Sequence, residues 1–259
     1  MKKYKLGVVE WGLPEVGPYA IELAKHYGLT HIQLNFTRDF EVNKYIERIV
    51  AASSQAQVEV SGIALNLLNE YHLSKKHAEM NNQSHSIFIA ALKSAISIGT
   101  KHIFIPSFYT GKLSTHNDIV NLSTYFRWAC QLALKHQITV STENALEADK
   151  ARELHKLVGM SNFKIIYDPY NYNINNINPI EIYKDLGTLF HRHVHIKNGS
   201  YSKGGIEELQ HGTMDIKVLF PYLHRNSIIF MENKYNILGE QSLFSDISYL
   251  KDIFSSELY

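Results

Sequence analysis

The sequence predicts a single-domain (β/α)₈ barrel, the TIM barrel fold, over residues 1–259. Short apolar runs rich in β-branched residues alternate with longer amphipathic stretches, a pattern typical of parallel strands joined by helical crossovers. Eight such units share 259 residues, so each takes about 32, the size of a minimal strand–helix repeat. Eight repeats of this size close naturally into a barrel.

The candidate strands recur along the whole chain. An open, doubly wound sheet is the main alternative to a barrel, and it usually carries a glycine-rich turn for nucleotide phosphates after its first strand. Here that turn reads Glu10-Trp11-Gly12-Leu13-Pro14, which lacks the glycine pattern and favours the barrel. In order, the predicted strands are Lys5–Val9, His31–Leu34, Val58–Leu65, His102–Ile105, Ile138–Ser141, Lys164–Tyr167, His193–Ile196 and Ile228–Met231.

Apolar residues between the predicted strands recur at the spacing of helices. In each of three sets the residues fall on one face of a 3.6-residue period, so each set predicts an amphipathic helix. The first set is Ile89, Leu92 and Ile96, the second is Leu122, Phe126, Ala129 and Ala133, and the third is Ile216, Leu219 and Leu223.

Capping residues mark the predicted helix ends. Asn178-Pro179 predicts an N-cap followed by a first-turn proline, and Gly187 fits just beyond the end of that helix. Asp215 predicts an N-cap for the third set. Gly28 and Gly99 each predict a helix end just before a strand.

The composition is ordinary for a globular protein and narrows the classes of partner. Hydrophobic residues make up 45% of the chain and charged residues 20%. The formal net charge is +1, from 26 basic and 25 acidic residues, so no basic excess exists to bind nucleic acid or an anionic membrane. We therefore expect no nucleic-acid partner and no membrane partner, and we leave a homo-oligomer open.

The single cysteine and the first residues bear on the compartment. Cys130 has no second cysteine to pair with and falls within a helical apolar pattern, so we expect a buried, inert thiol in a reducing compartment. The apolar run between Met1 and Glu10 is far shorter than the about 7–15 residues of a signal peptide or the about 20 of a membrane span. The sequence therefore predicts a cytoplasmic protein.

Four polar residues stand near the ends of four successive predicted strands: Glu143, Asp168, His195 and Glu232. A charged group that closes an apolar strand is costly unless that edge of the sheet uses it. Neighbouring strands of a barrel lie about 4.8 Å apart, so four inward-pointing side chains at its rim can converge on one ion. Three carboxylates and one imidazole predict a divalent-metal site, for Mn²⁺ first, then Mg²⁺, with Co²⁺ or Zn²⁺ as alternatives.

Each of these residues also has a structural explanation. Glu143 could be the acid that the first turn of a helix favours. Asp168 precedes Pro169 and could be a turn former, while His195 could be a hydrogen-bonded core histidine. Their recurrence on four consecutive strands favours one metal site over several separate structural roles.

The seventh predicted strand carries polar residues at alternate positions. If the strand is regular, His191, His193, His195 and Lys197 share one face. His195 then lies nearest the rim among the histidines, and His193 lies deeper as a hydrogen-bonded lining residue. Lys197 is either a solvated loop lysine or a cation that faces bound substrate. Three carboxylates on one dication leave a net negative site, which favours the second interpretation.

These motifs resemble those of the xylose isomerase-like superfamily of TIM barrels and, more narrowly, of its sugar phosphate isomerase/epimerase family. The resemblance covers nearly the whole chain in rhythm, but its specific motifs lie in the second half. They are Thr142-Glu143-Asn144, Asp168-Pro169-Tyr170-Asn171, His193-Val194-His195-Ile196-Lys197-Asn198, Gly212-Thr213-Met214-Asp215 and the Glu232 that ends the last strand.

The resemblance implies a ligand set and a catalytic set. Glu143, Asp168, His195 and Glu232 are then the metal ligands. Glu143 and Glu232 are also expected to move a proton on the two faces of a substrate carbon. Lys197 is expected to contact the substrate and to stabilise oxyanion charge.

Two further residues are predicted to contact substrate. Trp11, at the end of the first strand, could form an apolar wall against the carbon face of a sugar, with plain core packing as the alternative. Asn171 stands where the ketose 3-epimerases of this family have a substrate-binding histidine. Those enzymes also have an arginine where this chain has Tyr201, so their sugar chemistry does not transfer intact.

Other departures concern strand two and the endonuclease branch of the superfamily. Strand two commonly ends in a glutamate, whereas Gln33 and Asn35 occupy that region here. The endonuclease branch uses three zinc ions and has a histidine at the position of Asn171. The absence of this histidine, together with the near-neutral charge, argues against DNA repair.

The sequence thus predicts a metal-dependent isomerase or epimerase that acts through an enediolate on a small polyhydroxy carbonyl compound, either a sugar or a sugar phosphate. Two alternatives stay open. The same enediolate can expel a hydroxyl, as in a dehydratase of the inosose dehydratase type. A barrel that binds a metal and a ligand without catalysis is the other.

Overall fold

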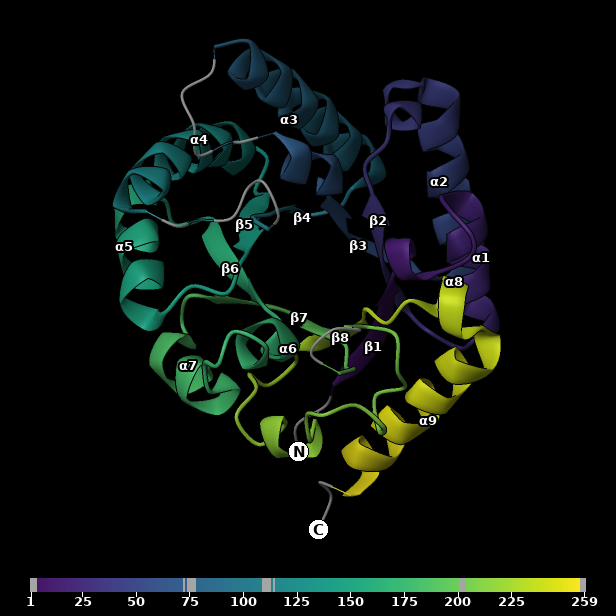
Figure 1. Cartoon of the computed structure of the whole chain (residues 1–259). Coiled ribbons are helices and arrows are strands. Elements are labelled where there is room, and N and C mark those ends of the chain that lie inside the picture. Colours follow the sequence, from purple (N-terminus) through teal and green to yellow (C-terminus); the bar gives the residue numbers. More distant parts are fainter. Residues whose placement is uncertain are drawn as a thin grey trace.

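The computed structural model describes residues 4–71, 73, 78–108, 113, 115–200 and 204–256. Its strands form a closed barrel in which each strand pairs in parallel with the next and β1 pairs with β8. Helices form a ring around the strands (Figure 1). The predicted (β/α)₈ barrel is confirmed. The strands are β1 Lys5–Val9, β2 His31–Asn35, β3 Glu59–Ala64, β4 His102–Pro106, β5 Thr139–Glu143, β6 Phe163–Tyr167, β7 Phe190–Ile196 and β8 Ile228–Met231.

The strands occupy their predicted places with small shifts of boundary. β5 runs on to Glu143 rather than ending at Ser141, and β7 begins at Phe190 rather than at His193. Glu143 is therefore itself a strand residue, in register with Ile166 of β6. The backbone position of Glu143 is therefore fixed by strand pairing in the barrel and not by a loop.

The helices of the outer ring fill the gaps between strands. They are α1 Pro18–His26, α2 Asn43–Ala56, α3 Ala78–Ile98, α4 His116–Leu134, α5 Ala148–Val158, α6 Pro169–Asn173, α7 Pro179–Leu186, α8 Tyr235–Leu238 and α9 Glu240–Ser256. Short 3₁₀ turns are η1 Glu10–Gly12, η2 Arg38–Glu41, η3 Asn66–Glu70 and η5 Lys217–Leu219. All four apolar residues of the set predicted on α4 are buried, so that helix and its inner face are confirmed.

The inner face predicted for α3 is wrong by one residue. Leu92 is buried as expected, but Ile89 and Ile96 are 40% and 44% exposed. Phe88 and Ala95, one position earlier, are fully buried instead. The small alanine lets the helix backbone approach β3 and β4, which α3 contacts.

The helix predicted after strand seven is also wrong. All three apolar residues of the third set are buried, but the chain forms only the turn η5 there. Pro221 has no backbone N–H and restricts the residue before it, so it opposes a helix through this segment. The predicted N-cap is wrong as well: Ile216 is the N-cap of η5, although Oδ1 of Asp215 accepts the backbone N–H of Lys217 at 3.0 Å.

The other predicted caps are confirmed. The Asn178 side chain accepts the backbone N–H groups of Ile180 and Glu181 at the start of α7. Gly28 and Gly99 have φ angles of +71° and +87°, in the left-handed region that favours glycine.

The N-terminal half of the barrel interior is polar. His102 of β4 and His193 of β7 meet across the barrel with their Nδ1 atoms 3.0 Å apart. Nε2 of His102 lies 2.6 Å from Oγ of Ser141, and Nε2 of Gln33 lies 3.3 Å from Nδ1 of His193. The prediction that His193 is a hydrogen-bonded lining residue is confirmed. Burial lowers the pKa of both imidazoles well below its ordinary value, so both are neutral near pH 7.

The single cysteine is buried, as predicted. Cys130 lies in α4 and forms no disulfide, and burial raises the pKa of its thiol to about 12. Within the described ranges, none of the helices has both the length and the apolar character that crossing a membrane requires.

Candidate active site

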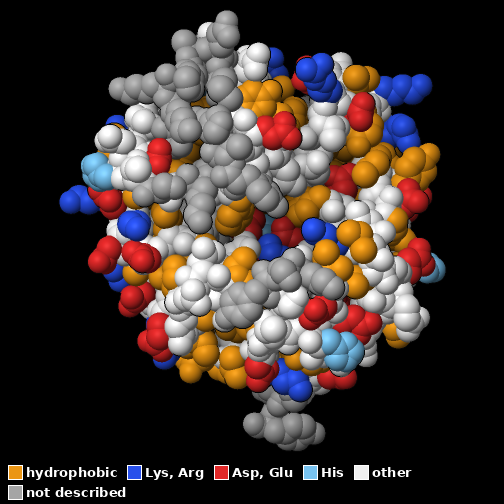
Figure 2. Space-filling view, viewed as in Figure 1, with side chains coloured by type: hydrophobic (Ala, Val, Ile, Leu, Met, Phe, Trp, Pro, Cys, Tyr) orange, Lys and Arg blue, Asp and Glu red, His pale blue; other side chains and the backbone are white. Residues whose placement is uncertain are grey.

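The C-terminal ends of the strands surround a cavity of about 910 Å³ at the mouth of the barrel. In Figure 2 the mouth is a hollow in which acidic and basic side chains gather. Active sites of this fold lie at this rim. The polar and aromatic residues of the lining include Trp11, Asn66, Asn69, Glu70, Glu143, Tyr170, Asn171, Lys197, Glu232, Lys234 and Asn236.

The five charged residues predicted for the site all reach this rim. Glu143 ends β5, Asp168 follows β6, His195 lies in β7, Lys197 follows β7 and Glu232 follows β8. Their side chains are at most 17% exposed. Five buried ionisable groups stay stable only if they pair with one another or with a bound ion.

His195 lies between the two glutamates. Its Nδ1 is 3.2 Å from Oε2 of Glu143 and 3.6 Å from Oε2 of Glu232. One potential ligand atom from each of the three residues lies within 4.8 Å of the other two. On the other side of the ring, Nε2 lies 2.7 Å from Oε1 of Gln33. Because an amide oxygen only accepts, Nε2 carries a proton, and Nδ1 faces the carboxylates.

Asp168 reaches the same centre through Lys197. Its Oδ2 is 2.7 Å from Nζ of Lys197, which also lies 2.8 Å from Oε2 of Glu232. The other oxygen, Oδ1, accepts the backbone N–H groups of Tyr170 and Asn171 as the N-cap of α6. The turn-forming role of Asp168 is therefore confirmed on Oδ1, while Oδ2 is engaged only by Lys197.

The donor set fits a divalent ion. Two buried atoms, Oδ2 of Asp168 and Nδ1 of His195, make no hydrogen bond of good geometry to any described residue and have only ion-pair contacts. Nδ1 of His195 faces Glu143 and Glu232, which form with it a group of three potential ligands. Oδ2 of Asp168 faces Nζ of Lys197 instead and is not in that group. Three carboxylates with one imidazole suit a hard or borderline dication.

The charges of the site perturb one another. Burial opposes charge on His195, but the two neighbouring glutamates outweigh it and raise the pKa of the imidazole to about 10. Burial raises the pKa of Asp168 to about 7, against the opposing effect of Lys197. Burial likewise opposes charge on Lys197, yet the surrounding carboxylates raise its pKa well above the ordinary value. The protein itself thus supplies cations to balance the three acids.

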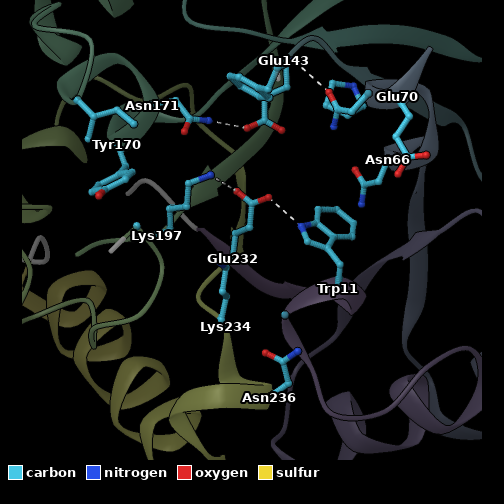
Figure 3. A pocket seen from close by; sticks show the side chains of 16 residues that line it. Trp11, Asn66, Glu70, Glu143, Tyr170, Asn171, Lys197, Glu232, Lys234 and Asn236 are labelled. Carbon is cyan, nitrogen blue, oxygen red and sulfur yellow. Dashed lines mark hydrogen bonds and ion pairs between the residues drawn. The ribbon is translucent and has the colours of Figure 1, made fainter. Parts of the chain in front are cut away.

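Each glutamate has one oxygen anchored and the other directed at the centre. Nδ2 of Asn171 donates to Oε1 of Glu143 at 2.8 Å, and Nε1 of Trp11 donates to Oε1 of Glu232 at 2.8 Å. Figure 3 shows Asn171 to the left of the Glu143 carboxylate and Trp11 to the right of the Glu232 carboxylate. Neutral donors thereby set the direction of both acids.

Trp11 both packs against other rings and lines the cavity. Its ring packs 5.7 Å from that of Phe104 and 6.0 Å from that of His195, and it also lines the cavity. Core packing and a wall facing the cavity are therefore both present. Its hydrogen bond to Glu232 was not foreseen, because no sequence spacing links two residues so far apart in the chain.

Sequence reasoning missed several residues of the site. Gln33 was noted only as a departure from the superfamily, yet it holds His195. Asn66 and Glu70 in η3, and Asn236 in α8, line the cavity from loops after β3 and β8. Their position just after strands was the available signal. Tyr201, another departure, lies outside the described residues.

The fold agrees with a comparison of sequences. The profile of the xylose isomerase-like TIM barrel family matches residues 21–236, so this protein belongs to that family. The predicted superfamily is confirmed.

One relative and two solved structures illustrate what this protein is similar to. The chain is 26% identical over 205 residues to the 2-epi-5-epi-valiolone 7-phosphate 2-epimerase of Actinoplanes sp., covering 77% of this chain and 74% of that one. The 3-keto-D-glucoside 4-epimerase of E. coli is similar in structure, with a TM-score of 0.78, 20% identity, and 96% and 100% of the two chains covered. The probable 3-DHS dehydratase of Bacillus anthracis has a TM-score of 0.75, 16% identity, and 95% and 98% covered. At these identities the structural likeness establishes the fold alone.

Proposed function

We propose that this protein is an isomerase or epimerase of a small sugar or sugar phosphate and that it depends on a divalent metal ion. One observation carries the proposal. Glu143 and Glu232 both face Nδ1 of His195, each with one oxygen anchored and the other directed at that nitrogen. A pair of carboxylates held in this way suits proton removal from one face of a carbon and proton return to the other. The Actinoplanes relative, named as an epimerase of a 7-phosphate, supports the reaction class.

Glu143, Asp168, His195 and Glu232 would hold the ion, with Mn²⁺ as the first candidate and Mg²⁺, Co²⁺ and Zn²⁺ as alternatives. The metal would supply Lewis-acid polarisation of a substrate carbonyl. Gln33 keeps the His195 proton on Nε2 and so leaves Nδ1 for the site. Such outer hydrogen bonds commonly orient metal-binding histidines.

Proton transfer is assigned to the glutamates. One carboxylate removes the proton from the carbon next to the carbonyl, and the electron pair of that C–H bond forms the enediolate. A carboxylic acid then returns a proton, to the opposite face of the same carbon in an epimerase or to the neighbouring carbon in an isomerase. The ammonium of Lys197, 2.8 Å from Glu232, stabilises the developing oxyanion.

Substrate binding is assigned to the cavity lining. Trp11 offers an apolar face to the carbons of a sugar, and Asn171 offers amide groups beside Glu143. Asn66 and Glu70 on one side and Lys234 on another supply further hydrogen-bonding groups for hydroxyls or a phosphate. A mixed polar and aromatic lining of this kind is typical of small-molecule sites.

Product analysis with Mn²⁺-loaded protein tests the proposal. A panel of ketoses, aldoses and cyclic polyhydroxy ketones, each with and without a phosphate, would be followed by chromatography and ultraviolet absorption. We expect an epimer or isomer of equal mass from at least one member. A product lighter by one water, with new ultraviolet absorption, would instead indicate a dehydratase. Binding without any product would reduce the protein to a carrier or sensor.

A further inference from the structure

A second group of metal-binding side chains lies at the opposite end of the barrel from the rim. His102 begins β4, and His191 and His193 lie in the first half of β7. One ring nitrogen from each lies within 4.8 Å of the other two. We propose that these three histidines form a second metal site that selects a borderline ion such as Zn²⁺.

His102 and His193 already have the spacing of two ligands of one ion. Their Nδ1 atoms are 3.0 Å apart. Two nitrogens bound to one Zn²⁺ at about 2.1 Å lie about 3.0–3.4 Å apart for bond angles between square and tetrahedral. Without metal, this distance corresponds to a hydrogen bond between one protonated and one unprotonated nitrogen. An ion can therefore replace the shared proton with little change in this distance, provided that both rings turn so that their lone pairs face the ion instead of each other.

The hydrogen-bond partners of both rings are compatible with unprotonated Nδ1 atoms on His102 and His193. The amide nitrogen of Gln33, 3.3 Å away, faces Nδ1 of His193 as a donor, which indicates a lone pair there. Ser141 Oγ is 2.6 Å from Nε2 of His102. Because a hydroxyl can accept as well as donate, Ser141 can hold His102 as the tautomer that leaves Nδ1 free for a metal.

His191 supplies the third nitrogen. Its ring centre is 4.1 Å from that of His102 and 4.3 Å from that of His193. The ring is stacked on His102, and its Nδ1 accepts the backbone N–H of His193 at 3.1 Å. Ligation requires the ring to turn out of this stack. Since His191 is only half-buried, it has room to do so, and the bound ion must offset the lost contacts.

A separate cavity gives an ion access to the three rings. It has a volume of about 340 Å³ and is lined by all three histidines, by Ser61 and by Glu59. The Glu59 carboxylate is 63% exposed and can balance part of the charge of an ion. Lys101 also lines this cavity, but its ammonium donates to the carbonyl of His136 at 3.2 Å. Barrels of this fold usually fill their interior with branched apolar residues, so an open, histidine-lined cavity is unusual here.

The two sites differ in the ions that they prefer. Carboxylate oxygens at the rim accept Mg²⁺, which neutral imidazoles bind poorly. Zn²⁺ and Co²⁺ bind imidazole well, so excess Mg²⁺ can occupy the rim while the histidine site stays available.

Titration of chelator-treated protein in excess Mg²⁺ tests the inference. Co²⁺ would be added and followed by visible absorption, and Zn²⁺ by competition with a coloured chelator. We expect one equivalent of Co²⁺ with the strong bands of a four- or five-coordinate site, displaced by Zn²⁺. His195→Gln should keep this equivalent, whereas His191→Gln should weaken it at least about tenfold. His155→Gln, which changes a histidine of α5 outside the cavity, is the matched control.

The outcomes separate cleanly. Absence of the imidazole-bound Co²⁺ spectrum in the unaltered protein would overturn the proposal without any variant. Equal Zn²⁺ affinity in His191→Gln and the unaltered protein would overturn it as well. Loss of the equivalent in His195→Gln, with retention in His191→Gln, would place the ion at the rim and refute a second site.

Discussion

The amide oxygen of Gln33 lies 2.7 Å from Nε2 of His195. This contact joins β2 to β7 across the barrel, and it directs Nδ1 of the histidine toward Glu143 and Glu232. A residue outside the predicted ligand set therefore orients one of the predicted ligands.

Replacement of Gln33 should weaken metal binding without removing a ligand. Gln33→Leu keeps the size of the side chain but cannot accept the His195 proton, so we expect Mn²⁺ affinity to fall about 10–100-fold. Gln33→Glu restores an acceptor and should bind Mn²⁺ nearly as well as the unaltered protein. Electron paramagnetic resonance titration measures both. Equal affinities in all three proteins would show that this contact does not orient a ligand.

Two substitutions of Asp168 distinguish its role as the N-cap of α6 from the role proposed for its charge in metal binding. Asp168→Asn retains the oxygen that caps α6 but loses the carboxylate, so it should lose Mn²⁺ binding and keep its stability. Asp168→Ala should lose binding and also about 1 kcal/mol of stability through the missing cap. Thermal melts and metal titrations measure the two effects. Normal Mn²⁺ affinity in Asp168→Ala would mean that the ligand set is wrong.

Lys197 should matter for turnover more than for metal binding. Lys197→Met removes the cation beside Glu232 and Asp168. We expect full occupancy at saturating Mn²⁺ and turnover about 10²-fold slower, because the oxyanion loses its charge partner. Lys197→Arg keeps the charge and should be less impaired. Unchanged turnover in Lys197→Met would leave this residue a purely structural counterion.

Asp246 in α9 should make stability depend on pH. Its carboxylate accepts hydrogen bonds from Leu209 N, Asn233 Nδ2 and Tyr235 OH, yet burial raises its pKa from 3.8 to about 6. Between these values the folded protein holds a proton that the unfolded chain has released, so the free energy of unfolding falls as pH rises from about 4 to about 6. The shift corresponds to roughly 3 kcal/mol at most.

Urea denaturation of the unaltered protein and Asp246→Asn at several pH values measures this effect. Because asparagine does not titrate, the stability of the unaltered protein relative to the variant should decline between pH 4 and pH 6 and level off above. A constant difference across that range would contradict the raised pKa.

The fold and the members of the site were predictable because both follow from local sequence pattern. Apolar runs mark the strands, and a polar residue at the end of each marks the rim, which is why Glu143, Asp168, His195 and Glu232 were found together. Parallel strands bring their ends to one edge whatever the details of packing. The period of two along β7 likewise predicts that His193 and His195 share one face, with His193 deeper in the barrel and His195 nearer the rim.

What could not be predicted depends on contacts between distant segments. No spacing indicates that Trp11 anchors Glu232 or that Gln33 holds His195, since these pairs meet only when the barrel closes. The inner face of α3 was misplaced because Ile96 is more hydrophobic than Ala95, while close packing favours the smaller residue. At η5 the apolar spacing was right but Pro221 prevents a helix.

The central claim is that Glu143 and Glu232 transfer a proton to and from a substrate carbon. It is tested most directly by measuring the exchange of solvent deuterium into substrate that the Mn²⁺-loaded protein catalyses. The best substrate from the panel would be incubated in deuterated buffer and followed by nuclear magnetic resonance. We predict deuterium at the carbon next to the carbonyl, and exchange at least about 10²-fold slower in Glu143→Gln and Glu232→Gln at saturating Mn²⁺, because an amide cannot act as the base. No exchange in any member of the panel, or exchange at the unaltered rate in both variants, would contradict proton transfer by these two glutamates.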